Sequence, residues 1–134
     1  MAEKLFRLEI ISPDKMFYTN DVVMAEYNTT EGEVGIYAGH IPMTQIIAPG
    51  QLTITEEGGQ KIAALLSGFV EITPEKVTIL AEAVEWPENI DVERAREARI
   101  RAERRISSGQ EDIDLARAEL ALKKALIRLD VAGK

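Results

Sequence analysis

The sequence predicts a β-plus-α fold in two parts: an antiparallel β-sandwich over residues 1–87, then an antiparallel two-helix hairpin over residues 88–134. All five Pro, every aromatic residue and seven of the nine Gly lie at or before Pro87. Residues 88–134 are rich in Ala, Leu, Arg and Glu, which favour helix, whereas turn-forming and β-branched residues favour short strands. The function is therefore expected to depend on how the helical hairpin acts relative to the sandwich.

Short apolar stretches separated by turn residues predict the strands of the first part. Apolar and polar residues alternate in the first stretch, Gly58-Gly59 suits a tight hairpin turn, and Pro74 lies in the turn of a second hairpin. Many short strands with frequent turns are typical of an antiparallel sandwich or barrel. The predicted strands are 5–11, 22–30, 34–37, 51–55, 61–67, 69–72 and 77–80.

Helical periodicity appears in two blocks after Pro87. Small and apolar residues recur at helical spacing in the first block, and Gly109 supplies a C-terminal stop. A second helix is predicted after residues 110–112, with an apolar face that Ile113 widens. The first block has Val92, Ala95, Ala98, Ala102 and Ile106, and the second has Leu115, Ala118, Leu122, Leu126 and Leu129.

A hairpin of this kind has little core of its own. Isolated helices of this length are marginal in water, so the hairpin must pack against something else. Two alternatives stay open: it docks permanently on the sheet, or it moves between two docking surfaces as a switch.

Composition excludes several classes of protein. The net charge is −7, with five Lys/Arg against thirteen Asp/Glu up to Pro87 and eleven against ten beyond it, so the basic excess typical of a nucleic-acid-binding protein is missing. The absence of Cys excludes a disulfide framework, a cysteine nucleophile and a zinc–thiolate site. No apolar run approaches the roughly 20 residues that span a bilayer, and no signal peptide is expected.

Catalysis finds little support in the sequence. His40 is the single His and lies in a Gly/Pro loop, and neither a Gly-rich phosphate loop nor an HExxH motif occurs. The paired acids Glu56 and Glu57 belong to a hairpin turn, where we expect them to be solvated. The protein is therefore not expected to be an enzyme.

Cations in the two predicted helices suggest an anion site. Spacings of seven and four residues put three cations on one face of each helix. If the hairpin folds symmetrically about Gly109, Arg94 lies level with Lys124, and Arg128 falls opposite Ile90 and Asp91. The two sets would then converge near a helix N-terminus, which also favours anions, so a polyphosphate is the expected ligand. The sets are Arg94, Arg101 and Arg105, and Arg117, Lys124 and Arg128.

A simpler interpretation of these residues stays open. Each Arg can belong to a solvated face, paired with a neighbouring acid such as Glu93, Glu97, Glu103 or Glu119. Asp91 is ambiguous in the same way. It can be the N-cap of the first helix, or its carboxylate, with that of Glu85, can fix nucleotide groups or orient the Arg side chains.

Two motifs resemble a known family. Residues 31–40, EGEVGIYAGH, resemble the EGExGIYxGH signature of the epsilon subunit of bacterial F-type ATP synthase, and residues 90–95, IDVERA, resemble that family's I(L)DxxRA motif. The resemblance covers essentially the whole chain and is strongest to the thermophilic Bacillus-type branch. It implies a sandwich of about ten strands and a helical hairpin, in a non-catalytic subunit of the rotor's central stalk.

The resemblance also implies partners and a location. The sandwich would bind the gamma subunit and the c-ring, with Glu33 and His40 facing the c-ring loops, although His40 can equally serve to fix its own loop. The protein would lie on the cytoplasmic face of the bacterial plasma membrane as a peripheral part of the synthase.

In the Bacillus-type branch the compact hairpin binds ATP without hydrolysing it. An extended hairpin reaches the alpha and beta subunits of the catalytic head and blocks hydrolysis. The branch usually has Arg where this chain has Lys124, which keeps the charge but loses the planar fork. Whether Mg²⁺ accompanies ATP stays open, as does the alternative of a structural rotor subunit that does not sense nucleotide. The ligands implied by the resemblance are Glu85, Ile90, Asp91, Arg94, Ala95, Arg101, Lys124 and Arg128.

Overall fold

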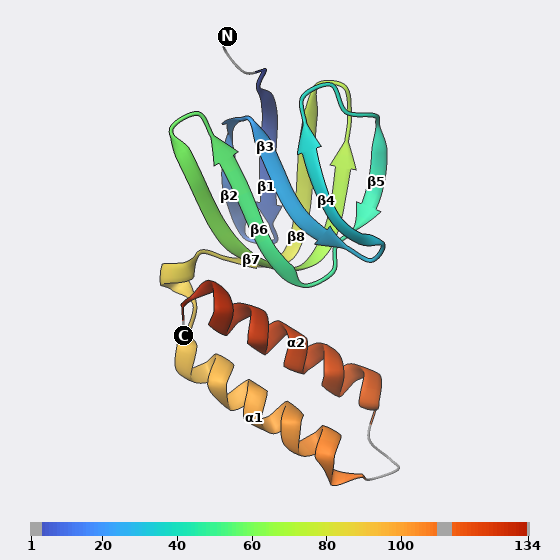
Figure 1. Ribbon diagram of the computed structural model, residues 1–134, viewed down its shortest axis with the longest axis vertical. Helices are drawn as coiled ribbons and strands as arrows, with labels where there is room; N and C mark the ends of the chain where they lie inside the picture. Colours follow the sequence, from blue (N-terminus) through green and yellow to red (C-terminus); the bar gives the residue numbers. More distant parts are fainter. Residues whose placement is uncertain (1–3, 110–113, 134) are drawn as a thin grey trace. The chain divides into compact units, whose positions relative to one another are not determined.

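The computed structural model describes residues 4–109 and 114–133. Predictions that fall on residues 110–113, including the role of Ile113, therefore lie outside the described residues. The chain divides into a sheet unit that ends at Glu85 and a helical unit that begins at Trp86, two residues before the boundary expected from sequence. Figure 1 shows the strands of the first unit and the helices of the second.

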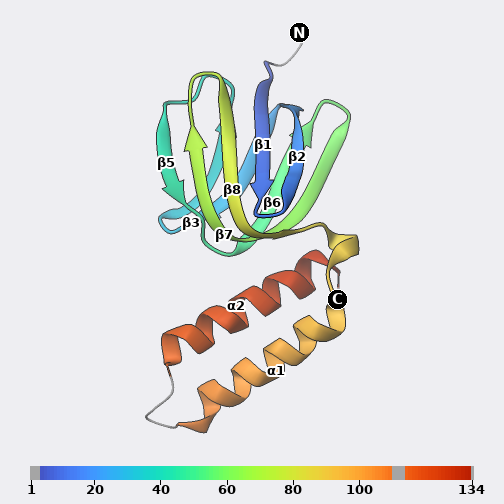
Figure 2. The ribbon, with the colours of Figure 1, turned by 180° about the vertical axis from the view of Figure 1, so that it is seen from behind.

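The sheet unit contains eight strands in two layers. Their hydrogen-bonded order is β2-β1-β8-β7-β6-β3-β4, and β5 pairs with β7. One layer contains β5, β7, β8, β1 and β2, and the other contains β4, β3 and β6; Figures 1 and 2 show them from opposite sides. The strands are β1 Phe6–Ser12, β2 Lys15–Val22, β3 Met24–Thr29, β4 Gly32–Tyr37, β5 Met43–Ile46, β6 Gly50–Glu56, β7 Gly59–Ile72 and β8 Lys76–Glu85.

The sandwich is confirmed, but several details differ from expectation. The described residues form eight strands rather than about ten, and β1 pairs with β8 in parallel in an otherwise antiparallel sheet. Strands β2 and β5 were missed because both are edge strands with mostly exposed residues, so neither carries a buried apolar stripe. The two strands expected on either side of Gly68 are one long strand, β7, which pairs with β6 through its first half and with β5 through its second.

Alternating side chains from both layers fill the core of the sheet unit. In the five-stranded layer, Ile10, Val70 and Ile79 lie in adjacent strands and are fully buried. Leu52 and Ile54 of β6 face them from the other layer and are also fully buried. This regular alternation fixes the register of every strand, because a slip of one residue would turn the apolar set toward solvent.

A polar contact joins the two layers at one edge. The Tyr18 hydroxyl of β2 donates a hydrogen bond to Glu56 at the end of β6, 2.5 Å away, and Asn20 donates to the same carboxylate oxygen. Burial and this hydrogen bond raise the pKa of the Tyr18 hydroxyl, and the hydrogen bond from Tyr18 lowers the pKa of the Glu56 carboxyl. Glu56 is therefore not simply a solvated turn residue, as its place beside Glu57 suggested.

Gly68 marks the point where the pairing of β7 with β8 shifts register. Its φ of +135° is rarely adopted by residues with a side chain. A Cβ atom there would lie 2.1 Å from the carbonyl oxygen of Leu80 and 2.9 Å from Cα of Ala81. Only glycine allows the two backbones to approach this closely, and the bulge lets β7 serve both layers.

The helical unit begins with a short 3₁₀ turn, Pro87–Asn89, and continues as helices α1 Val92–Ser108 and α2 Leu115–Val131. Gly109 ends α1 in the left-handed conformation, with φ 68°, as its sequence position predicts. Figures 1 and 2 show the two helices side by side and antiparallel, which confirms the hairpin. Neither helix has the length and hydropathy needed to cross a bilayer, as judged on the described residues.

Replacing Gly68 by Ala should destabilise the sheet unit by about 3 kcal/mol or more, because the new methyl group meets backbone atoms that cannot move independently. Gly58→Ala is the matched control, since nothing lies within 4 Å of its Cβ position, and it should change stability by no more than about 0.5 kcal/mol. Urea unfolding followed by circular dichroism measures both changes. Equal stability of the two variants would contradict the close approach at Gly68.

Candidate functional site

Small side chains line the contact between the two helices. Ala95 and Ala102 of α1 are buried, as are Ala118 and Ala125 of α2, and each pair is spaced by seven residues. We call these four residues the alanine seam. Methyl groups keep the helix axes close together, so long side chains that flank the seam on one helix can reach those that flank it on the other.

The predicted cations flank this seam on one face. Each seam residue follows a cation directly, giving Arg94-Ala95 and Arg101-Ala102 on α1, and Arg117-Ala118 and Lys124-Ala125 on α2. When a two-fold axis perpendicular to the plane of two antiparallel helices relates one to the other, residues at equivalent positions of the two helices lie on the same face of the hairpin. Positions that immediately precede the seam residues therefore share one face.

The structure gives the ends of both helices of the hairpin. Each has 17 residues, with the N-cap of α1 at Asp91 and that of α2 at Asp114. If the helix ends pair, Val92 lies beside Val131 and Arg94 lies level with Leu129, next to Arg128. The register centred on Gly109, with Arg94 level with Lys124, stays a prediction.

The predicted ligands near the start of α1 have defined local roles. Asp91 is the N-cap, and its Oδ1 accepts a hydrogen bond from the Arg94 backbone N–H at 3.1 Å, as the simpler interpretation held. Ile90 and Ala95 are buried, so any contact they make with a ligand is through the backbone or at the edge of the side chain. Glu93 is not free to pair with Arg94, because it binds Arg96 at 2.6 Å.

The remaining predicted ligands are spread along the hairpin. Arg101 is exposed and Lys124 is half-buried in the middle of their helices, and Arg128 is half-buried in the last turn of α2. Glu85 is the last residue of the sheet unit and lies five positions before Ile90 in the chain. In the described part of the chain, no three acidic or His side chains gather in a way that could hold a metal ion.

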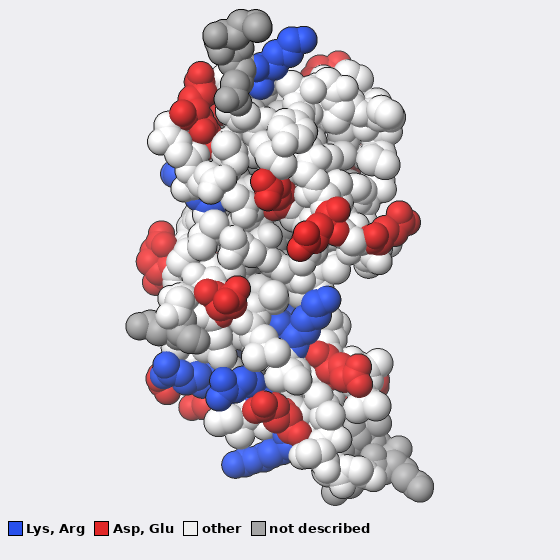
Figure 3. Space-filling model, viewed as in Figure 1, with Lys and Arg blue, Asp and Glu red and all other residues white. Residues whose placement is uncertain are grey.

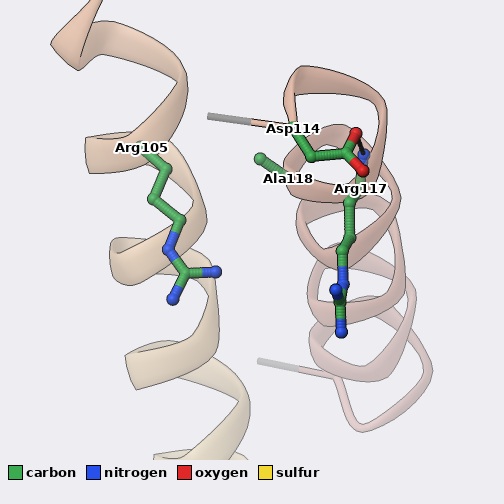
Figure 4. A pocket seen from close by; sticks show the side chains of 4 residues that line it. All are labelled: Arg105, Asp114, Arg117 and Ala118. Atoms are coloured by element: carbon green, nitrogen blue, oxygen red, sulfur yellow. Dashed lines mark hydrogen bonds between the residues drawn. The ribbon is translucent and has the colours of Figure 1, made fainter. Parts of the chain in front are cut away.

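A hollow at the other end of the hairpin was not among the predicted ligand sites. Its volume is about 410 Å³, and its described lining consists of Arg105, Asp114, Arg117 and Ala118. Figure 4 shows Arg105 on α1, with its guanidinium group on the side nearer α2, and Arg117 on α2, with its side chain running along its own helix. A sequence signal for it exists, because Asp-x-x-Arg-Ala occurs at 91–95 and again at 114–118.

Glu33 and His40, the residues expected at a c-ring contact, lie in β4 and in the loop that follows it. His40 is held by its own unit: Nδ1 lies 2.6 Å from the Tyr37 carbonyl oxygen and Nε2 lies 3.0 Å from that of Thr73, and the ring packs edge-on against Phe6. His40 therefore fixes the β4–β5 loop to the β7–β8 turn, the alternative that the sequence left open.

Glu33 instead lines a shallow hollow of about 340 Å³ on the outer face of β3, β4 and β6. Glu26 shares this lining with uncharged polar side chains, and Figure 3 shows acidic side chains gathered on this side of the sheet unit. Such a surface suits a cationic partner group.

An apolar row crosses the outer face of the five-stranded layer. Strand pairing places its members next to one another on all five strands, and four of them are between 42% and 54% exposed. Contiguous apolar side chains on the outside of a sheet mark an interaction surface. We call this set the outer apolar row; it consists of Ile46, Phe69, Leu80, Ile11 and Met16.

Comparison with known proteins assigns a family to each part of the chain. Residues 5–87 match the model of the ATP synthase delta/epsilon chain β-sandwich domain, and residues 88–133 match that of the ATP synthase delta/epsilon chain long α-helix domain. The ATP synthase epsilon chain of Halalkalibacterium halodurans is 46% identical over 128 residues, which cover 95% of this chain and 96% of the relative. That of Bacillus pumilus is 44% identical over 131 residues, covering 98% and 99%.

Solved structures show the same fold. A chain of the Euglena gracilis mitochondrial ATP synthase, in a structure of OSCP, F1 and the c-ring, superposes with a TM-score of 0.81 at 27% identity, covering 97% of this chain and 82% of that one. A chain of the Tetrahymena thermophila mitochondrial ATP synthase central stalk and c-ring gives a TM-score of 0.62 at 13% identity, covering 98% and 99%. The second likeness concerns the fold alone.

Replacing Asp91 by Ala should weaken the first turn of α1 by about 1 kcal/mol, because the Arg94 N–H loses its acceptor. Asp91→Asn keeps an acceptor oxygen without the charge and should cost only a few tenths of this. Amide hydrogen exchange in the first turn of α1 measures both. If Asn proved as damaging as Ala, the carboxylate charge would matter more than the cap.

Proposed function

Since the chain belongs to the family of ATP synthase delta/epsilon chains and is an epsilon-type subunit of the synthase's central stalk, we propose that its hairpin regulates ATP hydrolysis by binding ATP without hydrolysing it. The observation that carries this proposal is the cation face of the alanine seam. Arg94 lies in the first turn of α1 and Arg128 in the last turn of α2, so the antiparallel hairpin has both at the end where α1 begins.

The triphosphate fits this face by charge and by shape. The guanidinium groups of Arg94 and Arg128 offer planar forks of donors to phosphate oxygens, and Arg101 and Lys124 continue the positive charge along the seam. The first turn of α1 adds its free N–H groups. Lys124 contributes charge without a fork, so it binds phosphate as a point charge.

The other proposed ligands would hold the remainder of the nucleotide. The second carboxylate oxygen of Asp91 and the carboxylate of Glu85 accept hydrogen bonds from hydroxyl or amino groups, and Ile90 and Ala95 offer backbone groups. Mg²⁺, if it enters with ATP, would be held chiefly by the phosphates.

Regulation follows as a shift in population. ATP between the helices stabilises the compact hairpin by about 2.7 kcal/mol at a concentration one hundred times its Kd. Without ATP, the hairpin extends toward the alpha and beta subunits and blocks hydrolysis. The alanine seam suits this exchange, because methyl groups bury little apolar surface and hold the compact form only moderately. A ligand acts on such an equilibrium only through its different affinity for the two states.

The sheet unit would serve as the fixed attachment. We assign the outer apolar row to the contact with the gamma subunit and the acidic hollow at Glu33 to the c-ring, whose loops would supply the cationic group. These contacts would hold the protein at the cytoplasmic face of the bacterial plasma membrane without insertion. Nothing in this role requires the protein to catalyse a reaction.

Calorimetric titration of the full chain with ATP tests the regulatory site. Wild type should release heat at a single site, and Arg94→Gln/Arg128→Gln should weaken binding about 100-fold or more, because two charge-assisted contacts are lost. Arg96→Gln/Arg104→Gln removes the same charge from α1 and should leave binding nearly unchanged. An absence of heat with the wild-type chain would leave only the alternative, a structural rotor subunit that does not sense nucleotide.

Changes in the outer apolar row test the attachment surface. Phe69→Ser should weaken binding to purified gamma subunit at least about tenfold, because a large exposed aromatic ring in the middle of an interface contributes most of its energy. Glu71→Gln, two positions along the same strand and face, is the control and should bind like wild type. A fluorescence titration measures both, and unchanged binding of Phe69→Ser would remove this surface from the proposal.

A further inference from the structure

The two helices of the hairpin begin in the same way. Asp91 and Asp114 are their N-caps, with backbone φ and ψ of −79° and 95° in one and −77° and 94° in the other. Each carboxylate accepts a hydrogen bond at 3.1 Å from the backbone N–H of an Arg three residues on, Arg94 and Arg117. In both helices that Arg is followed by a buried Ala of the seam.

The likeness continues along both helices at a constant offset of 23 residues. In each helix, the second alanine of the seam, the cation that precedes it and the Arg of the last turn have counterparts in the other helix. Two antiparallel helices with the same pattern are related by an approximate two-fold axis that crosses the seam. The corresponding pairs are Asp91 and Asp114, Arg94 and Arg117, Ala95 and Ala118, Arg101 and Lys124, Ala102 and Ala125, and Arg105 and Arg128.

This symmetry gives the two ends of the hairpin equivalent sets of side chains. Where α1 begins, the set is Asp91, Arg94 and Arg128, all among the proposed ATP ligands. At the opposite end its counterparts are Asp114, Arg117 and Arg105, and these line the hollow of about 410 Å³. Both Arg residues line it, one from each helix, and Figure 4 shows the Arg117 side chain lying along α2.

The charges in this hollow favour an anion. Among the described residues, neither Arg105 nor Arg117 has an acidic side chain within ion-pair distance, whereas Arg96 and Arg99 on the same hairpin pair with Glu93 at 2.6 Å and Glu103 at 3.6 Å. The Oδ1 atom of Asp114 is already used by the backbone of Arg117. Two guanidinium groups near each other repel, and one doubly charged oxyanion between them can accept hydrogen bonds from both.

We propose that the hairpin carries a second phosphoryl-binding site, formed by Arg105 and Arg117 with the start of α2, and related to the nucleotide site by the two-fold axis. Its ligand is a phosphoryl dianion, supplied by inorganic phosphate or by the terminal phosphate of a nucleotide. The inference rests on the proposed function in taking phosphoryl as the anion. A bound anion joins the last turn of α1 to the first turn of α2 and stabilises the compact hairpin by mass action.

The test is a titration of the ¹⁵N-labelled full chain with sodium phosphate, with ionic strength held constant by sodium chloride. The side-chain Nε–H resonances of Arg105 and Arg117 should shift and saturate together with the backbone amide resonances in the first turn of α2, which remain observable in every variant. Arg105→Gln/Arg117→Gln should bind at least about tenfold more weakly, because both charge-assisted contacts are lost. The control Arg96→Gln/Arg104→Gln removes the same charge elsewhere on α1 and should titrate like wild type.

A conservative variant separates binding from folding. Arg117→Lys keeps the charge and the helix but loses the fork, so its affinity should lie between those of wild type and the double variant. Helical circular dichroism without phosphate should be unchanged in all variants. Equal, unsaturated shifts of the backbone amides in the first turn of α2 in wild type and the double variant, or the same shifts with chloride alone, would overturn the proposal.

The two sites can fail separately. In Arg94→Gln/Arg128→Gln, phosphate should still shift the resonances of Arg105 and Arg117. If ATP shifts the same resonances at a lower concentration than phosphate does, the nucleotide is the source of the phosphoryl group. If wild type shows no calorimetric heat with ATP but phosphate still saturates this hollow, the proposed function fails and the second site stands. If ATP binds but phosphate leaves Arg105 and Arg117 unshifted, only the second site fails.

Discussion

The close approach of α1 and α2 along four buried alanines is the constraint on which the hairpin's chemistry depends. Methyl groups let the helix axes lie near each other, and this distance decides whether cations that flank the seam can share a ligand. Larger seam residues would add apolar contact but separate the two rows of cations. In the proposed site, an anion would offset the repulsion between cations of the two helices.

The two units meet different physical requirements. The sheet unit buries regular apolar rows from both layers, and Gly68 allows β7 to serve both of them, so it has a well-defined core and can present the outer apolar row as a fixed surface. The hairpin has a seam of small side chains, with cations on both helices. The proposed regulation needs these two properties: one unit with a well-defined core for attachment, and one whose helices are held together only moderately.

Local chemistry predicted much of this structure. Gly109 ends α1, Asp91 caps it, and the hairpin between β7 and β8 turns where Pro74 lies, because each of these depends on neighbouring residues only. The strands missed were β2 and β5, whose exposed residues follow no apolar pattern and whose place depends on partners far along the chain. The parallel pairing of β1 with β8 joins residues about 70 positions apart and has no local signal.

For the site, the sequence by itself determined which side chains are available: the two rows of cations, their helical spacing, and the repeated Asp-x-x-Arg-Ala motif. Only the tertiary structure decided which of them meet. The helices end at Ser108 and begin again at Leu115, and the antiparallel hairpin puts Arg94 and Arg128 toward one end and Arg105 and Arg117 toward the other. The reason is that side-chain periodicity is a property of one helix, whereas register is a property of two helices and the connection between them.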